Sequence, residues 1–329
     1  MNKKTTLLLT LFSCLPLLFS CNKEGVDGVE GYAIKYRSRP ELFLPADFTK
    51  QPNIVIMGDG FTVSDFGAFE AAAKKVIDNL FSVSPFNADP FDKYFNVFFV
   101  YLNSPERGIG HGKAKNTALR CYFYSGTEIF FDDVNSTGGR KALNPFEVAE
   151  YYVPGINLST TVVVVLVNDN QTGYITSFRN VAPFDQWISI ISIPDNPDDF
   201  KRLVLKEVGG KGFAHLGDED GPYSSEFKIM IKNMYATYGF YANLDITAKE
   251  DEVRWKHFLP YKSTIYKNIG IFDIGSGVYR PDENNVMMRY GTLQYDPPSR
   301  EAIIKRIYTI HAWDYTRAVF NYYFVDNPI

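Results

Sequence analysis

Residues 187–220 read WISIISIPDNPDDFKRLVLKEVGGKGFAHLGDED and carry the clearest strand-to-helix signal in the chain. The apolar, β-branched run at 187–193 predicts a buried strand. Asn196 can cap a following helix, because a proline and two acidic residues come next and suit its first turn. Apolar residues then recur at helical spacing until Gly209 and Gly210, which we expect to interrupt the helix.

Strands and helices also alternate on either side of this stretch. The run TTVVVVLV at 160–167 is apolar on both faces and is typical of a central strand. Residues 31–50 look extended and suggest a short edge element. The remaining patterns predict strands at 53–57 and 94–102 and helices at 65–81, near 224–238 and at 299–323. The sequence therefore predicts an α/β fold.

Composition excludes several classes of protein. The 329 residues include 34 basic and 38 acidic side chains, a formal net charge of −4, and 45 % of them are apolar. Such a chain buries one or two full cores and is neither disordered nor a disulfide-stapled mini-protein. It lacks the basic footprint of a nucleic-acid-binding protein, so no nucleic-acid partner is expected.

Residues 1–21 have the pattern of a lipoprotein signal peptide. Two lysines precede an apolar run at 7–19, which is shorter than the ~20 residues that cross a membrane as a helix. The run ends in Leu-Phe-Ser-Cys, which resembles a bacterial lipobox with Cys21 as the lipid attachment site. An ordinary signal peptide with a chance cysteine is the alternative. We expect a lipid-anchored protein of the cell envelope, in the outer membrane because no Asp follows Cys21; its membrane face stays open.

The chain divides into three segments by these criteria. Residues 1–21 are the signal peptide, 22–50 a tether with a short extended segment, and 51–329 one domain, since no linker or internal repeat divides them. Lipidation of Cys21 and removal of the signal peptide leave Cys121 as the lone thiol. It is expected to be a buried small hydrophobe.

The segment from Lys206 to Asp220 resembles a zinc-peptidase motif. In H-E-x-x-H, two histidines on one helix face hold Zn²⁺ and the glutamate is the general base. Glu207 has the position of that glutamate, and Lys206 stands where the first histidine belongs. The residues LGDED at 216–220 are similar to the L-x-D-E-Y that follows in the IgA-peptidase family of zinc metallopeptidases, with Asp220 in place of the aromatic.

The resemblance to that family, in its Bacteroides-type lipoprotein form, runs in order from about residue 53 to 307. It includes IMGDGF at 56–61, Asn116-Thr117-Ala118, Tyr279-Arg280-Pro281, and Asn285 with Met287. The family implies a zincin-like metallopeptidase domain with a mixed sheet, an active-site helix packed on it and a helical C-terminal part.

Both histidine ligands of the family are absent from this chain. The second one would fall at Gly210, or at Lys211 in a Gly-Gly-His form of the motif. A protonated lysine has no lone pair for a metal, and its deprotonation near neutral pH costs several kcal/mol at ~1.4 kcal/mol per pKa unit. Zinc is the cofactor of the family, but we expect no metal here.

The four histidines do not replace the missing ligands. His215 lies nine residues after Lys206, half a turn out of phase on an ideal helix. His111 is predicted in a loop and His311 in the last helix, while His257 follows a tryptophan. None forms an i, i+3 or i, i+4 ligand pair.

Lys206 and Lys211 together carry the same charge as Zn²⁺ with two neutral imidazoles. We hypothesise that they neutralise Glu207 and Asp218 in an ion-paired cluster that preserves the pocket without a metal. The alternative is that both are solvated lysines that remain after the loss of activity.

These observations favour a catalytically inactive family member that binds a protein or glycan in the former cleft. An active metallopeptidase is a second hypothesis, with Glu207 as catalytic residue and a metal held by Asp218, Glu219 and Asp59, whose oxygens favour Ca²⁺ or Mn²⁺. The position of Asp59 after a strand suits a site or a plain turn equally. A structural or sugar-binding envelope protein is the third.

Overall fold

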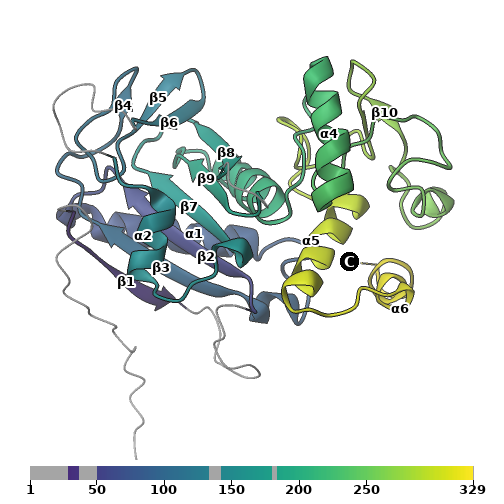
Figure 1. The fold of residues 1–329 in the computed structure, drawn as a ribbon, viewed down its shortest axis with the longest axis horizontal. Coiled ribbons are helices and arrows are strands. Elements are labelled where there is room, and N and C mark those ends of the chain that lie inside the picture. Colours follow the sequence, from purple (N-terminus) through teal and green to yellow (C-terminus); the bar gives the residue numbers. More distant parts are fainter. Residues whose placement is uncertain (1–28, 37–49, 133–141, 180–183, 329) are drawn as a thin grey trace, which may run out of the picture.

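A computed structural model gives the fold and describes residues 29–36, 50–132, 142–179 and 184–328 (Figure 1). The predicted signal peptide, the lipid attachment site at Cys21 and most of the predicted tether lie outside these ranges. Within them, no helix combines the length and the apolar character needed to cross a membrane.

A curled, mixed sheet of nine strands forms the centre of the fold, in the order β1-β3-β2-β7-β9-β8-β6-β5-β4. A separate two-stranded sheet pairs β10 with β11. The strands are β1 (Gly31–Tyr36), β2 (Asn53–Asp59), β3 (Asn96–Leu102), β4 (Gly110–His111), β5 (Cys121–Ser125), β6 (Glu128–Phe131), β7 (Thr161–Val167), β8 (Tyr174–Phe178), β9 (Trp187–Ile191), β10 (Phe272–Asp273) and β11 (Tyr279–Arg280).

The middle of the large sheet is parallel and buried on both faces. β2 pairs in parallel with β3 and β7, and β7 with β9. In β7, Val162, Val164 and Leu166 join one apolar cluster, whereas the alternate residues of the strand join the cluster on the opposite face. The four strands predicted here are confirmed, because an all-apolar run with period-two side chains serves two cores at once.

Helices cover both faces of the sheet. The larger apolar cluster holds residues of α1, α3, η4 and α5, and the cluster on the other face holds residues of α2 (Figure 1). The α-helices are α1 (Phe66–Leu80), α2 (Pro145–Tyr152), α3 (Pro197–Leu203), α4 (Ser225–Tyr238), α5 (Pro297–Ile310) and α6 (Arg317–Asn321). The 3₁₀ segments are η1 (Val63–Asp65), η2 (Phe91–Tyr94), η3 (Leu158–Thr160) and η5 (Leu259–Tyr261), and the π-helices are η4 (Val204–Phe213) and η6 (Tyr322–Asp326).

The glycine pair does not interrupt the central helix, which corrects the expectation from sequence. α3 begins after its cap Asn196, as predicted, and continues without a break into the π-helix η4. A Cβ at Gly209 would clash with the hydroxyl of Tyr295, and a Cβ at Gly210 with the sulfur of Met287. The glycines therefore let two large side chains pack against the helix backbone.

The predicted C-terminal helix 299–323 is also corrected, because it is divided. α5 ends at Ile310, Ala312 has a left-handed φ of 54°, and α6 starts after its N-cap Thr316. His311 therefore lies just past α5 rather than inside a helix. The break turns the chain back so that the rings of Phe320 and Phe324 pack on Phe258.

Candidate functional site

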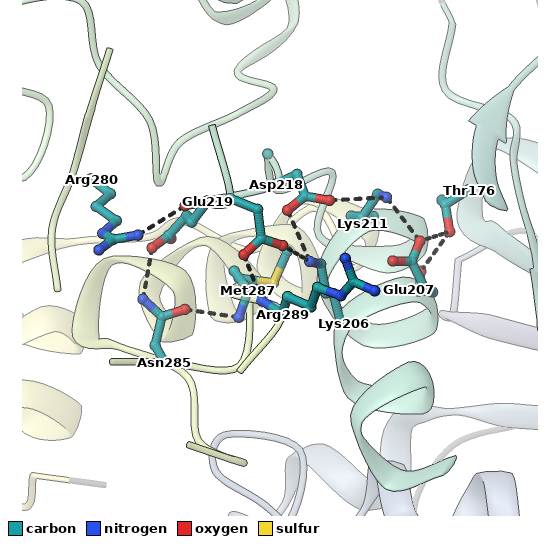
Figure 2. A network of polar contacts seen from close by, with 12 residues as sticks. Thr176, Lys206, Glu207, Lys211, Asp218, Glu219, Arg280, Asn285, Met287 and Arg289 are labelled. Atoms are coloured by element: carbon teal, nitrogen blue, oxygen red, sulfur yellow. Dashed lines mark hydrogen bonds and ion pairs between the residues drawn. The ribbon is translucent and has the colours of Figure 1, made fainter. Parts of the chain in front are cut away.

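Five charged side chains meet where η4 faces the chain segment 218–220. Lys206 Nζ lies 2.8 Å from Asp218 Oδ1 and 2.6 Å from Asp220 Oδ2. Lys211 Nζ lies 2.9 Å from Glu207 Oε2 and 3.7 Å from Asp218 Oδ2 (Figure 2). We call this group the ion cluster. Its contacts confirm the hypothesis that the two lysines pair with Glu207 and Asp218, and exclude two solvated lysines.

Lys206 and Glu207 of the ion cluster are shielded from solvent, and Lys211 is mostly so, with 17 % of its side chain exposed. Lys206 is 3 % exposed and Glu207 is fully buried. Asp218 and Asp220 keep about a third of their side chains exposed. In the sequence, Asp220 stands out only because it replaces the aromatic residue of the family motif. The structure shows that its carboxylate is the second one to contact Lys206. Glu207 and Lys211 are four residues apart, so local sequence already allowed their pairing.

The π-helical turn decides which residue stands next to Lys206. With i→i+5 hydrogen bonding, a π-helix rotates less per residue than an α-helix, so residues four and five apart both lie near the same side. Lys206 and Lys211 both reach Asp218, whereas the α-carbon of Gly210 faces Met287. Of the two registers left open by sequence, the one that pairs Lys206 with Lys211 is the one that the structure brings together.

Glu207 is held by a strand as well as by a lysine. Thr176 of β8 donates a hydrogen bond from Oγ1 to Glu207 Oε2 at 2.7 Å. Among the described residues no partner reaches Glu207 Oε1, although the atom is buried. The sequence did not indicate Thr176 as a site residue, because strand β8 was not predicted. The alternation of side-chain character in YITSF was the pattern that could have indicated this strand.

Asp218, Glu219 and Asp220 are anchored to the turn around Met287. Glu219 accepts hydrogen bonds from the amide groups of Asn243 and Asn285, each at 2.7 Å. Its own N–H donates to the carbonyl of Met287, and the N–H of Arg289 donates to Asp220 Oδ1. Met287 is fully buried in the larger apolar cluster. The family-like pair Asn285 and Met287 thus fixes the acidic side of the ion cluster (Figure 2).

The electrostatics of the ion cluster keep both lysines protonated. Burial alone would lower the pKa of Lys206, but the carboxylates of Asp218 and Asp220 outweigh it and raise the pKa above its usual value. Lys211 has a raised pKa for the same reason, with Glu207 as its main partner. Ammonium groups cannot coordinate a metal, so the donor set at these two positions does not fit zinc.

The other candidate residues lie away from the ion cluster. Asp59 is fully buried and accepts hydrogen bonds from Thr117 and from the N–H groups of Leu119 and Cys121, so it is a structural anchor. Cys121 is buried, as predicted. No group of three or more His, Cys, Asp or Glu side chains suited to a metal occurs in the described ranges.

The histidines are engaged elsewhere. His215 is buried, and its ring stacks on Trp187. His111 lies in the short strand β4, not in a loop as predicted, and contacts Asp169 at 2.9 Å. His257 pairs with Glu301, and the ring of His311 stacks on Trp313.

Asp296, the N-cap of α5, is predicted to destabilise the protein at neutral pH. Burial raises the pKa of Asp296 to about 6, and burial together with the charge of Asp296 raises the pKa of Glu219. Because the folded-state pKa exceeds the ordinary value of 3.8, stability falls as pH rises from about 4 to 6.

Asp296→Asn keeps an N-cap for α5, where Asp296 accepts the N–H of Ser299, but removes the buried charge. We expect a gain of about 2 kcal/mol in the free energy of unfolding near pH 7.5 and no gain near pH 4. Urea unfolding of the wild type and of Asp296→Asn at both pH values measures this difference in the free energy of unfolding. An equal change at the two values would show that the charge of Asp296 is not the cause.

One comparison with known proteins identifies a relationship. The family model for IgA Peptidase M64 matches residues 41–265, more than half of the chain. The matched range includes the ion cluster and every strand of the large sheet except β1. No curated protein sequence matches the chain.

Proposed function

The chain belongs to the IgA peptidase M64 family, and from this premise we propose that it is a non-catalytic member that binds its ligand without a metal. One observation carries the proposal: Lys206 and Lys211 hold the carboxylates of Asp218 and Glu207 at 2.8 and 2.9 Å. The resemblance places the first histidine ligand of the family at Lys206 and, in a Gly-Gly-His form of the motif, the second at Lys211. Their replacement by ammonium groups leaves two fixed cations where a hydrolase of this family needs lone pairs.

Glu207 is equally unsuited to act as a general base. A base must present a free carboxylate within hydrogen-bond reach of the proton that it abstracts. Here one oxygen of Glu207 is shared by Lys211 and Thr176, and the side chain has no exposed surface. The ion cluster therefore supports a rigid binding surface rather than a reaction centre.

The proposed setting is the bacterial cell envelope. Residues 1–21 support a lipid anchor at Cys21, and an outer-membrane location is consistent with the residue after it. The proposed ligand is a protein or a glycan bound at the former cleft.

Metal content and hydrolysis test the proposal together. We expect the purified protein, dialysed against zinc, to retain less than about a tenth of an equivalent by elemental analysis. Its hydrolysis of casein should equal that of the Glu207→Gln variant. Near one equivalent of zinc, lost in Asp218→Ala, would overturn the proposal, as would casein hydrolysis that Glu207→Gln abolishes.

A further inference from the structure

Three aromatic side chains meet His311 where the chain turns from α5 toward α6 (Figure 1). The indole of Trp313 stacks on the imidazole of His311, with ring centres 4.3 Å apart and an angle of 15° between the planes. Tyr94 of η2 and Tyr308 of α5 make T-shaped contacts with the indole, at 5.1 and 5.6 Å. We call these four residues the aromatic corner. None of them belongs to the ion cluster, and three lie beyond the residues that the family model matches.

Trp313 is held in place by its neighbours but stays open to solvent. Its indole contacts three other rings, yet 40 % of the residue is exposed. The other two tryptophans of the chain, Trp187 and Trp255, are 3 % and 1 % exposed. A large side chain that is fixed before binding loses little conformational entropy when a ligand covers it. The aromatic corner is therefore a preorganised surface.

The size and charge of the aromatic corner narrow the class of ligand. Burial lowers the pKa of His311, so its imidazole is uncharged near pH 7. The exposed part of one tryptophan covers about 100 Å², whereas each partner in a stable protein interface buries about 800 Å². Asp314, the next residue, is exposed, and its carboxylate opposes insertion of the corner into a lipid layer. These features favour a small, neutral ligand over a folded protein or a membrane.

We propose that the aromatic corner binds a neutral glycan, with one pyranose ring stacked on the exposed part of the Trp313 indole. A β-linked glucose ring with equatorial hydroxyls presents a flat face of axial C–H groups. The partial positive charge of these groups complements the electron-rich face of the indole. The indole N–H can donate a hydrogen bond to a hydroxyl of the same sugar. The site shares no residue with the ion cluster, so the inference does not depend on the proposed function.

The probe is cellohexaose, a neutral oligomer of β-linked glucose, and quenching of tryptophan fluorescence by iodide reports where it binds. Because Trp187 and Trp255 are buried, iodide quenches mainly Trp313. We expect a dissociation constant on the order of 1 mM, and about twofold weaker quenching at saturation. Sorbitol, an open-chain polyol without a ring, should give no protection. Cellohexaose that shows no binding by calorimetry at about 10 mM, or that binds without protecting Trp313, would overturn the inference.

Trp313→Ala and Tyr124→Ala form a matched pair of variants. Both remove an exposed aromatic ring, but Tyr124 lies in β5 and its ring packs on Phe130. We expect calorimetry to show that Trp313→Ala binds cellohexaose at least about tenfold more weakly and that Tyr124→Ala binds it as the wild type does. Equal affinities of the two variants would contradict the inference. If Trp313→Ala does not fold, iodide quenching of the wild type decides.

Lipid vesicles test the competing class of partner. Equimolar vesicles of phosphatidylethanolamine and phosphatidylcholine should leave the iodide quenching of Trp313 unchanged. Protection by the vesicles and not by cellohexaose would assign the aromatic corner to a lipid surface and refute glycan binding. Zinc retention or casein hydrolysis would refute the non-catalytic proposal alone, because the aromatic corner takes no part in either.

Discussion

Lys206→Met is expected to lower the free energy of unfolding by about 3 kcal/mol, because it removes the buried cation that Asp218 and Asp220 share and leaves Asp218 only its longer contact with Lys211. Methionine matches much of the volume of lysine, so the change tests charge rather than packing. Lys206 is 3 % exposed and lies within 2.8 Å of both Asp218 and Asp220. The partial exposure of those two carboxylates keeps the cost at the lower end for a buried pair.

Urea unfolding followed by circular dichroism measures this effect. Lys249→Met is the matched control, since the pair of Lys249 with Glu252 is exposed on both sides and should contribute less than about 0.5 kcal/mol. Unfolding of Lys206→Met at the wild-type urea concentration would show that the ion cluster does not stabilise the fold.

The double variant Lys206→His/Lys211→His is expected to bind about one equivalent of Zn²⁺ where the wild type binds almost none. Both lysine side chains reach Asp218, so two imidazoles at these positions and the Asp218 carboxylate place three zinc ligands around one point. Zinc binding should weaken below about pH 6, because protonated imidazole loses its lone pair. Isothermal titration with Zn²⁺ and elemental analysis measure the gain.

A second double variant, with histidine at position 210 instead of 211, is the control for the expected gain in zinc binding. Lys206→His/Gly210→His follows the ordinary H-E-x-x-H spacing, but a side chain at position 210 meets Met287. We expect no zinc binding there. Tighter binding by the Gly210 variant than by the Lys211 variant would show that η4 is an ordinary α-helix in solution.

Local sequence patterns were sufficient to predict the parallel strands at the centre of the fold. β7 and β9 and the start of α3 follow from apolar runs and a cap, which depend on near neighbours in the chain. The edge strand β1 occupies the extended N-terminal segment that the sequence suggested. Short strands such as β8 were missed, since a half-exposed strand of five residues has a weak pattern.

The sequence by itself determined the family and the central strands, because each is a property of residue types at fixed spacing. Only the tertiary structure decided that Asp220 joins the ion cluster and that Asp59 does not join it. It also decided that Lys211, rather than Gly210, shares Asp218 with Lys206. These outcomes depend on how a π-helical turn and the Met287 turn pack against each other. Such packing joins residues far apart in the chain, so no local spacing encodes it.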